Sequence, residues 1–195
     1  GLDTNNCGTW SDTVDVLVHE LPVPKIAASG LTEFCDGDSV TLAAPPGYIS
    51  YLWSNGDTSE TIVARISADY TVSVIDTNGC MGISEPVTVT VHALPMPVIA
   101  ANGATTFCDG DSVVIGVQEG FAEYRWSTGD TTPVITARVS GDYYVQVADT
   151  NGCMTMSDTI AVTVHPNPIV PVIAASGPTT FCDGDSVQLD APSGY

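Results

Sequence analysis

The chain repeats itself with a period of about 73 residues, and this period constrains its fold more than any other feature. The segment TTFCDGDSV stands at residues 105–113 and again, letter for letter, at 179–187, and LTEFCDGDSV at 31–40 is a looser copy. A second motif recurs with the same period: it reads DTNNC at 3–7 and DTNGC at 76–80 and 149–153. Because such a spacing is typical of tandem domains, we expect an array of copies of one unit.

The period divides the chain into two complete units and two partial ones. We place the complete units at residues 23–95 and 96–168. Residues 1–22 are then the C-terminal part of a preceding unit, and 169–195 the N-terminal part of a following one. Prolines, which stiffen short linkers, stand at the junctions (Pro24, Pro97 and Pro171). We expect the units to be arranged head to tail. We also expect this sequence to be one part of a longer repetitive protein.

The hydrophobic pattern inside a unit predicts β-strands. Segments that alternate in polarity or are rich in β-branched and aromatic residues lie, in the first complete unit, at 24–29, 39–44, 49–54, 61–66, 69–76 and 86–92. Turn-forming PPG, NGD and TNG sequences separate several of them. About seven strands in so short a unit predict an all-β fold, a small sandwich of two sheets.

Two aromatic positions make this sandwich immunoglobulin-like. Trp53 and Trp126 fall in the third strand of their units, and Tyr70 and Tyr143 follow an aspartate at the head of a late strand. Immunoglobulin folds carry a core Trp on strand C and a corner Tyr two residues before the second cysteine. We therefore predict tandem immunoglobulin-like β-sandwich repeats.

The cysteines of that pattern are missing from the core positions. The position of the second cysteine, two residues after the corner Tyr, holds Val72 or Val145. The facing position on strand B, where the first cysteine would lie, holds Leu42 or Ile115. Apolar packing is thus expected to replace the inter-sheet disulfide, so the cysteines must serve elsewhere.

The motifs resemble those of a known group. FCDGDSVTL, YLWSNGDTSETI and ADYTVSVIDTNGC, with FAEYRWSTGDTTPVI and GDYYVQVADTNGC in the second unit, are similar to the Ig-like or PKD-like repeats of large cell-surface adhesins and gliding-motility-associated proteins of the bacterial phylum Bacteroidota. The resemblance covers both complete units and both partial ones. It implies export through the type IX secretion system and an extracellular, cell-surface location.

Charge and hydropathy exclude two classes of partner. Four Lys and Arg against 23 Asp and Glu give a net charge of −19, which repels phosphate backbones and anionic membrane surfaces. No apolar run approaches the roughly 20 residues that span a bilayer. We therefore expect neither nucleic-acid binding nor direct membrane insertion by these residues.

The six cysteines leave several pairings open. Disulfides are favoured in an exported chain with small cores, although free thiols are also possible. In an immunoglobulin order Cys35 and Cys80 lie at opposite ends of a unit, roughly 20 Å apart. Head-to-tail stacking would instead bring Cys35 to Cys153. We predict this link between units, with Cys35–Cys80 and Cys108–Cys153 within units as the alternative.

The acidic turns could hold calcium, because carboxylate and amide oxygens are its preferred ligands. At a junction between units the candidates are Asp36 and Asp38 with Asp149 and Asn151. Asp-Gly and Asn-Gly are also ordinary turn formers, and no EF-hand spacing is present, so turn formation alone explains these residues better than calcium binding does.

The resemblance also implies O-glycosylation at Asp-Ser/Thr-aliphatic triplets. Such triplets place candidate acceptors at Thr13, Ser39, Ser112, Thr159 and Ser186.

No motif indicates catalysis. His19, His92 and His165 are expected at strand ends or in linkers, without a nucleophile beside them. The predicted function is structural: a repeat region that extends and stiffens a secreted surface fibre, stalk or adhesin. Its partners would be neighbouring repeats and other copies in a filament. The alternatives are a glycan- or protein-binding array that acts by avidity, favoured by exposed aromatic side chains, and an accessory array of a secreted enzyme.

Overall fold

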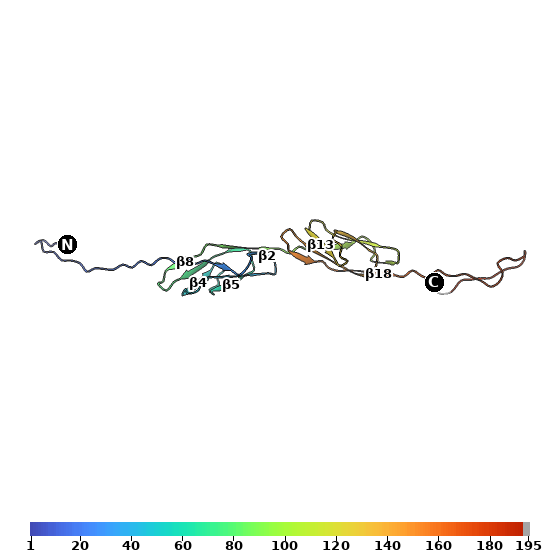
Figure 1. Ribbon diagram of the computed structural model, residues 1–195, viewed down its shortest axis with the longest axis horizontal. Helices are drawn as coiled ribbons and strands as arrows, with labels where there is room; N and C mark the ends of the chain where they lie inside the picture. The colour runs from blue at the N-terminus through green and yellow to red at the C-terminus, as the bar shows by residue number, and fades with distance from the viewer. Residues whose placement is uncertain (193–195) are drawn as a thin grey trace. The chain divides into compact units, whose positions relative to one another are not determined.

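The computed structural model describes residues 1–192, and within that range it contains strands and no helix. The chain forms two compact units, Gly1–Ala93 and Leu94–Tyr195. The first unit holds β1 (Ala27–Ala28), β2 (Glu33–Cys35), β3 (Val40–Ala43), β4 (Ser50–Trp53), β5 (Thr61–Ala64), β6 (Ala68–Tyr70), β7 (Val72–Ile75), β8 (Met81–Ile83) and β9 (Val87–His92). The all-β class predicted from the sequence is confirmed (Figure 1).

The second unit repeats this order. It holds β10 (Ile99–Ala101), β11 (Thr106–Cys108), β12 (Val113–Val117), β13 (Glu123–Trp126), β14 (Val134–Ala137), β15 (Gly141–Tyr143), β16 (Val145–Ala148), β17 (Met154–Met156) and β18 (Ile160–His165), followed by β19 (Ala174–Ala175) and β20 (Leu189–Asp190).

Each unit is a sandwich with immunoglobulin-like strand pairing. In the first, β1-β3-β5 form one antiparallel sheet, while β4-β7-β8 and β2-β9-β6 form the two halves of the other. Strands β6 and β7 are one arm of a long hairpin and β8 and β9 the other, because Tyr70 pairs with Val87 and Ile75 with Met81. The short strand β2 runs parallel to β9. The second unit has the same pairings.

A β-bulge divides the long hairpin into its two halves. In the first unit the Ser84 N–H donates to the Val72 carbonyl at 3.0 Å, and the Val72 N–H donates to the Ser84 hydroxyl at 3.0 Å. The serine side chain thus replaces a carbonyl of the ladder at the point where the register shifts. Ser157 and Val145 repeat the arrangement in the second unit, at 2.9 and 3.1 Å.

The core confirms the apolar replacement of the inter-sheet disulfide. Leu42 and Val72 in the first unit, like Ile115 and Val145 in the second, are 0% exposed. The tryptophans are buried beside them, and the Trp53 Nε1–H donates to the Ser59 carbonyl at 2.8 Å.

The corner tyrosines also occupy their predicted place. The Tyr70 hydroxyl donates to the Ile66 carbonyl at 3.1 Å, and the Tyr143 hydroxyl donates to the Val139 carbonyl at 3.0 Å. Each ring is buried. Both units therefore carry the tyrosine corner of immunoglobulin-like domains.

Residues 1–22 and 169–192 contain little regular structure. Within residues 1–22 the pairing is a single bridge between Leu2 and Gly8, and near the C-terminus β19 pairs with β20 in the register of β1 with β3. Apolar side chains such as Val16 and Val170 are exposed there. The boundaries at 22/23, 95/96 and 168/169 stay predictions, and residues 193–195 lie outside the described range.

Candidate functional site at the repeat ends

One end of each unit is the turn of the long hairpin, where a cysteine follows an aspartate. The Asp76 carboxylate accepts the N–H groups of Asn78 and Cys80 at 2.9 and 2.8 Å. Hydrogen bonding from the Cys80 N–H is the largest cause that holds the pKa of Asp76 below its ordinary value of 3.8. The aspartate thus fixes the turn and with it the cysteine backbone.

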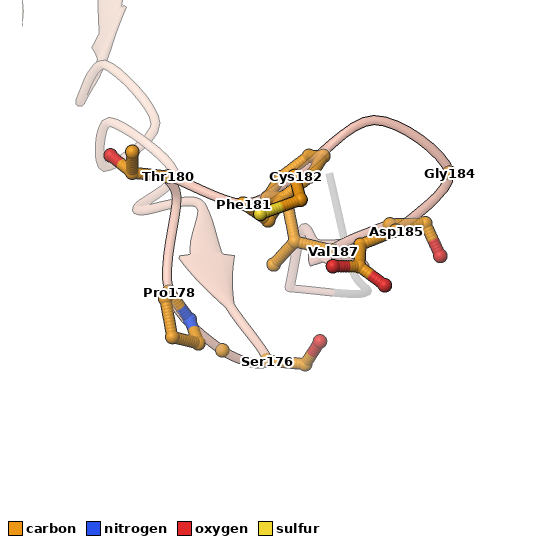
Figure 2. Close-up of a pocket in the computed structure, with 10 residues that line it drawn as sticks. Ser176, Pro178, Thr180, Phe181, Cys182, Gly184, Asp185 and Val187 are labelled. Atoms are coloured by element: carbon orange, nitrogen blue, oxygen red, sulfur yellow. The ribbon is translucent and has the colours of Figure 1, made fainter.

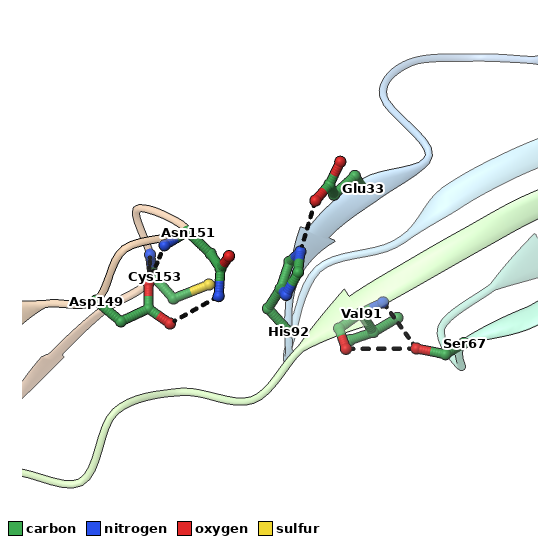
Figure 3. Close-up of polar contacts among 7 residues, drawn as sticks. All are labelled: Glu33, Ser67, Val91, His92, Asp149, Asn151 and Cys153. Atoms are coloured by element: carbon green, nitrogen blue, oxygen red, sulfur yellow. Dashed lines mark hydrogen bonds and ion pairs between the residues drawn. The ribbon is translucent and has the colours of Figure 1, made fainter.

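The second unit builds the same turn around Cys153 (Figure 3). The Asp149 Oδ1 accepts the N–H groups of Asn151 and Cys153 at 2.9 and 2.8 Å, and the Asn151 side-chain amide donates to Oδ2 at 3.3 Å. Cys153 is fully buried at 0% exposure, whereas Cys80 is partly buried.

The opposite end of the first unit carries Cys35. It is the last residue of β2 and pairs with His92, the last residue of β9. His92 Nε2 lies 2.8 Å from Glu33 Oε1, and the backbone of the neighbouring Val91 exchanges hydrogen bonds with the Ser67 hydroxyl (Figure 3). The sequence predicts neither β2 nor this ion pair, because β2 is only three residues long and its partner β9 is distant in sequence.

The long hairpin rules out a disulfide within one unit. Cys80 lies in its turn, while Cys35 lies beside His92 at the far end of the same arm. His92 is twelve residues after Cys80 along this arm. At about 3.3 Å per residue these two residues are roughly 40 Å apart, which is more than the roughly 20 Å expected from the sequence. Since bonded cysteines need Cα atoms within about 7 Å, the alternative pairing predicted above does not fit the fold. Cys108, which pairs with His165, and Cys153 are separated in the same way.

The cysteines differ in oxidation state. Cys35 and Cys153 are disulfide-bonded. Within residues 1–192 the free cysteines are Cys7, Cys80, Cys108 and Cys182, of which all but Cys80 are exposed. The disulfide is consistent with an oxidising, extracellular environment.

The junction segment before β1 packs against its own unit. Pro24 is fully buried, and residues Val23 to Ile26 face Ile83 to Val87 across a hollow of 310 Å³. In Figure 1 the blue N-terminal segment reaches the first unit beside β8. Gly82 pairs with the inward-facing Val74, and a Cβ on Gly82 would collide with the Pro22 carbonyl. The junction therefore covers an end of the core at a position where only glycine fits.

The second unit has Thr155 in place of Gly82. Its hydroxyl oxygen is buried and has no hydrogen-bond partner in the described part of the chain, and such a group costs free energy. Pro97 is only partly buried, whereas its counterpart Pro24 is fully buried. The two junctions are therefore packed differently.

The other predicted site residues lie on the surface. Asp36, Asp38 and Asn151 are exposed and Asp149 is partly buried, and among residues 1–192 no cluster of three His, Cys, Asp or Glu side chains is placed to hold a metal ion. The five candidate glycosylation hydroxyls, at Thr13, Ser39, Ser112, Thr159 and Ser186, are all exposed. His92 and His165 end β9 and β18 as expected, whereas His19 lies outside any strand.

A hollow of 670 Å³ lies among residues 176–187 and includes Phe181, Cys182 and Asp185 (Figure 2). Phe181 is 49% exposed, whereas its counterparts Phe34 and Phe107 pack against the cores of the complete units. The hollow therefore borders a phenylalanine that is more exposed than its counterparts in the complete units.

Comparison with known proteins shows similarity to several solved structures. No family model matches the chain, and no curated protein matches it. Murine CEACAM1b is 12% identical with a TM-score of 0.34, over 73% of this chain and 99% of that one. The human OSCAR ligand-binding domain is 14% identical with a TM-score of 0.31, over 74% and 100%. Three N-terminal domains of the bacteriophage RB49 outer capsid protein Hoc are 16% identical with a TM-score of 0.37, over 88% and 70%. From its own strand pairing, each complete unit is an immunoglobulin-like domain.

Among the described residues no helix is long and apolar enough to cross a membrane.

Proposed function

We propose that this chain is a structural repeat region of a secreted cell-surface fibre, stalk or adhesin, which extends and stiffens the protein that carries it. The observation that carries the proposal is the packed junction. Pro24 is buried and the Pro22 carbonyl lies against Gly82, so the segment that enters the first unit packs against it at these two prolines and is not a free linker there. A chain whose junction segments pack against the units has fewer flexible linkers than one whose junctions are exposed.

We further propose that Cys35 and Cys153 bond to each other, and that equivalent bonds link each repeat to the next. The support is chemical: both are disulfide-bonded, while Cys80 and Cys108, their counterparts in the other unit, are free. The bond would close a loop of roughly 120 residues, which on the chain-entropy model stabilises the folded state by roughly 4 to 5 kcal/mol. Tension along the fibre would then pass through covalent bonds.

The proposal places the repeats outside the cell, where the disulfide would persist, and gives them no catalytic role. Neighbouring repeats, and other copies in a filament, are the proposed partners. Glycans on the exposed Ser and Thr hydroxyls would be a compatible addition, whereas the described residues form no cluster that would hold calcium at Asp36, Asp38, Asp149 and Asn151.

Small-angle scattering of the oxidised chain tests the stiffening role. We expect a rod-like particle. The distribution of its maximum dimension should be narrow when the disulfide is present and broader in Cys35→Ser. Cys182→Ser, which removes an exposed free thiol, is the matched control and should scatter like the parent chain. A compact globule, or equal flexibility in all three proteins, would contradict the proposal.

A further inference from the structure

The outer face of one sheet in the second unit carries an unusual row of side chains. Arg125 on β13 pairs with Gln146 on β16, which pairs with Met156 on β17. The neighbours Trp126 and Val145 are buried, so alternation along the strands directs the row to the solvent side. Arg125 and Met156 are exposed, and Gln146 is partly buried.

This row lines a shallow cavity of 300 Å³ together with Tyr144 and Gly129. Tyr144 is 37% exposed, unlike the buried corner tyrosine beside it. Gly129 lies in a turn at φ +91°, with open space where a Cβ would be. The cavity therefore combines a cation, an aromatic ring, an amide and an apolar side chain. Its volume is at the lower end of the range for small-ligand sites, which is about 300 to 1,000 Å³.

The Arg125 guanidinium has no acidic partner within residues 1–192, where the ion pair present is that of Glu33 and His92. It is one of four Lys and Arg residues in a chain with 23 acids. The nearest acid along its own strand face is Glu123, two residues earlier, which pairs with Ala148 in the next row. An unpaired guanidinium presents a planar fork of donors that matches a carboxylate.

We propose that this cavity binds a sugar that carries a single carboxylate, such as a terminal uronic acid of a glycan. Arg125 would hold the carboxylate, the Gln146 amide would bond to ring hydroxyls, and the Tyr144 ring with Met156 would cover the apolar face of the sugar ring. A cavity of 300 Å³ accepts one sugar unit, and the net charge of −19 disfavours a polyanion. This site is independent of the stiffening role proposed above.

The first unit is an internal control, because it has the same sheet without the site. The positions of Arg125, Tyr144, Gln146 and Met156 are occupied there by Leu52, Thr71, Ser73 and Ile83. Leu52 pairs with Ser73 and Ser73 with Ile83, so the backbone row is the same. It offers no cation and no aromatic ring.

Titration of the isotope-labelled full chain with D-glucuronate, followed by amide and methyl NMR shifts, tests the proposal. We expect saturable shifts at Gln146 and Met156, none at Ser73 and Ile83, and none with glucose. Arg125→Gln should weaken binding roughly ten- to hundredfold, as expected for a lost charge-assisted contact. Arg138→Gln removes the same charge from the opposite sheet of the same unit and should bind like the parent chain.

Two further variants sharpen the test. Glu123→Gln should strengthen binding, because it removes the one acid on that strand face. The triple change Leu52→Arg, Thr71→Tyr and Ser73→Gln should transfer binding to the first unit. Absence of saturable shifts, equal binding by Arg125→Gln and the parent, or binding of an acidic peptide without the sugar would overturn the proposal.

Discussion

The two complete repeats share their interior and differ on their surfaces. Trp53 and Trp126 occupy the same buried site, and Leu42 in one unit is replaced by Ile115 in the other, with no exposed area in either. On the outer face of the β4-β7-β8 sheet, by contrast, Leu52 corresponds to Arg125 in the second unit. A buried side chain must fill a fixed volume, whereas a solvent-facing one is free to acquire a role. Differences between copies therefore point to sites that belong to one unit.

The largest expected effect comes from breaking one core while leaving the other intact. Trp53→Ala should destabilise the first unit by roughly 3 to 5 kcal/mol, because it removes a large buried side chain and leaves a cavity. Scanning calorimetry should show the transition of the first unit move to lower temperature while that of the second stays in place. Trp126→Ala is the matched variant and should do the reverse. A single transition that shifts equally in both variants would show that the two units do not unfold separately.

The two junctions differ at the position of Gly82 and Thr155. A valine at this position should have opposite effects on the stability of the two units. Gly82→Val should destabilise the first unit by roughly 1 to 3 kcal/mol, because its side chain would collide with the Pro22 carbonyl. Thr155→Val should stabilise the second unit by roughly 1 kcal/mol, because it removes a buried hydroxyl without a partner.

Denaturant unfolding of the two variants measures both changes. A tolerated valine at position 82 would mean that the junction segment does not pack there. Destabilisation by Thr155→Val would mean that its hydroxyl finds a partner in solution.

The bulge serines allow a finer comparison. Ser84→Ala should cost roughly 1 to 2 kcal/mol, because the Val72 N–H would lose its acceptor in a buried site. Ser157→Ala should cost less, since Ser157 is only partly buried and water can replace its hydroxyl. Hydrogen exchange at the Val72 and Val145 amides reports each loss directly, and equal protection before and after the change would contradict the bulge assignment.

The smallest effect is electrostatic. The folded state lowers the pKa of Asp76 below 3.8, so the charged form favours folding. Its contribution is complete above the unfolded pKa of about 3.9 and is lost as the pH falls through the lower folded value. The melting temperature of Asp76→Asn should therefore lie slightly below that of the parent at neutral pH, and the gap should close in acid. A gap that does not vary with pH would assign the loss to hydrogen bonding alone.

Much of the fold follows from sequence periodicity because the core positions are copied. Tyr70, Trp53 and the apolar pair Leu42 and Val72 were all predicted and are buried as expected. The sequence prediction missed two short strands, β2 and β8. Strand β2 is three residues long and is defined by parallel pairing with β9, which no local pattern reveals. The row of Arg125, Gln146 and Met156 also depends on register across three strands, and sequence alone does not place Met156 beside Gln146.

The central claim is that a covalent bond links one repeat to the next, and non-reducing peptide mapping of the intact oxidised chain tests it most directly. Free thiols would be alkylated before digestion, and the linked peptides identified by mass. We predict one cross-linked species that joins the Cys35 peptide to the Cys153 peptide, with alkylated Cys80 and Cys108. A species that joins Cys35 to Cys80, or alkylated Cys35 and Cys153, would contradict the account.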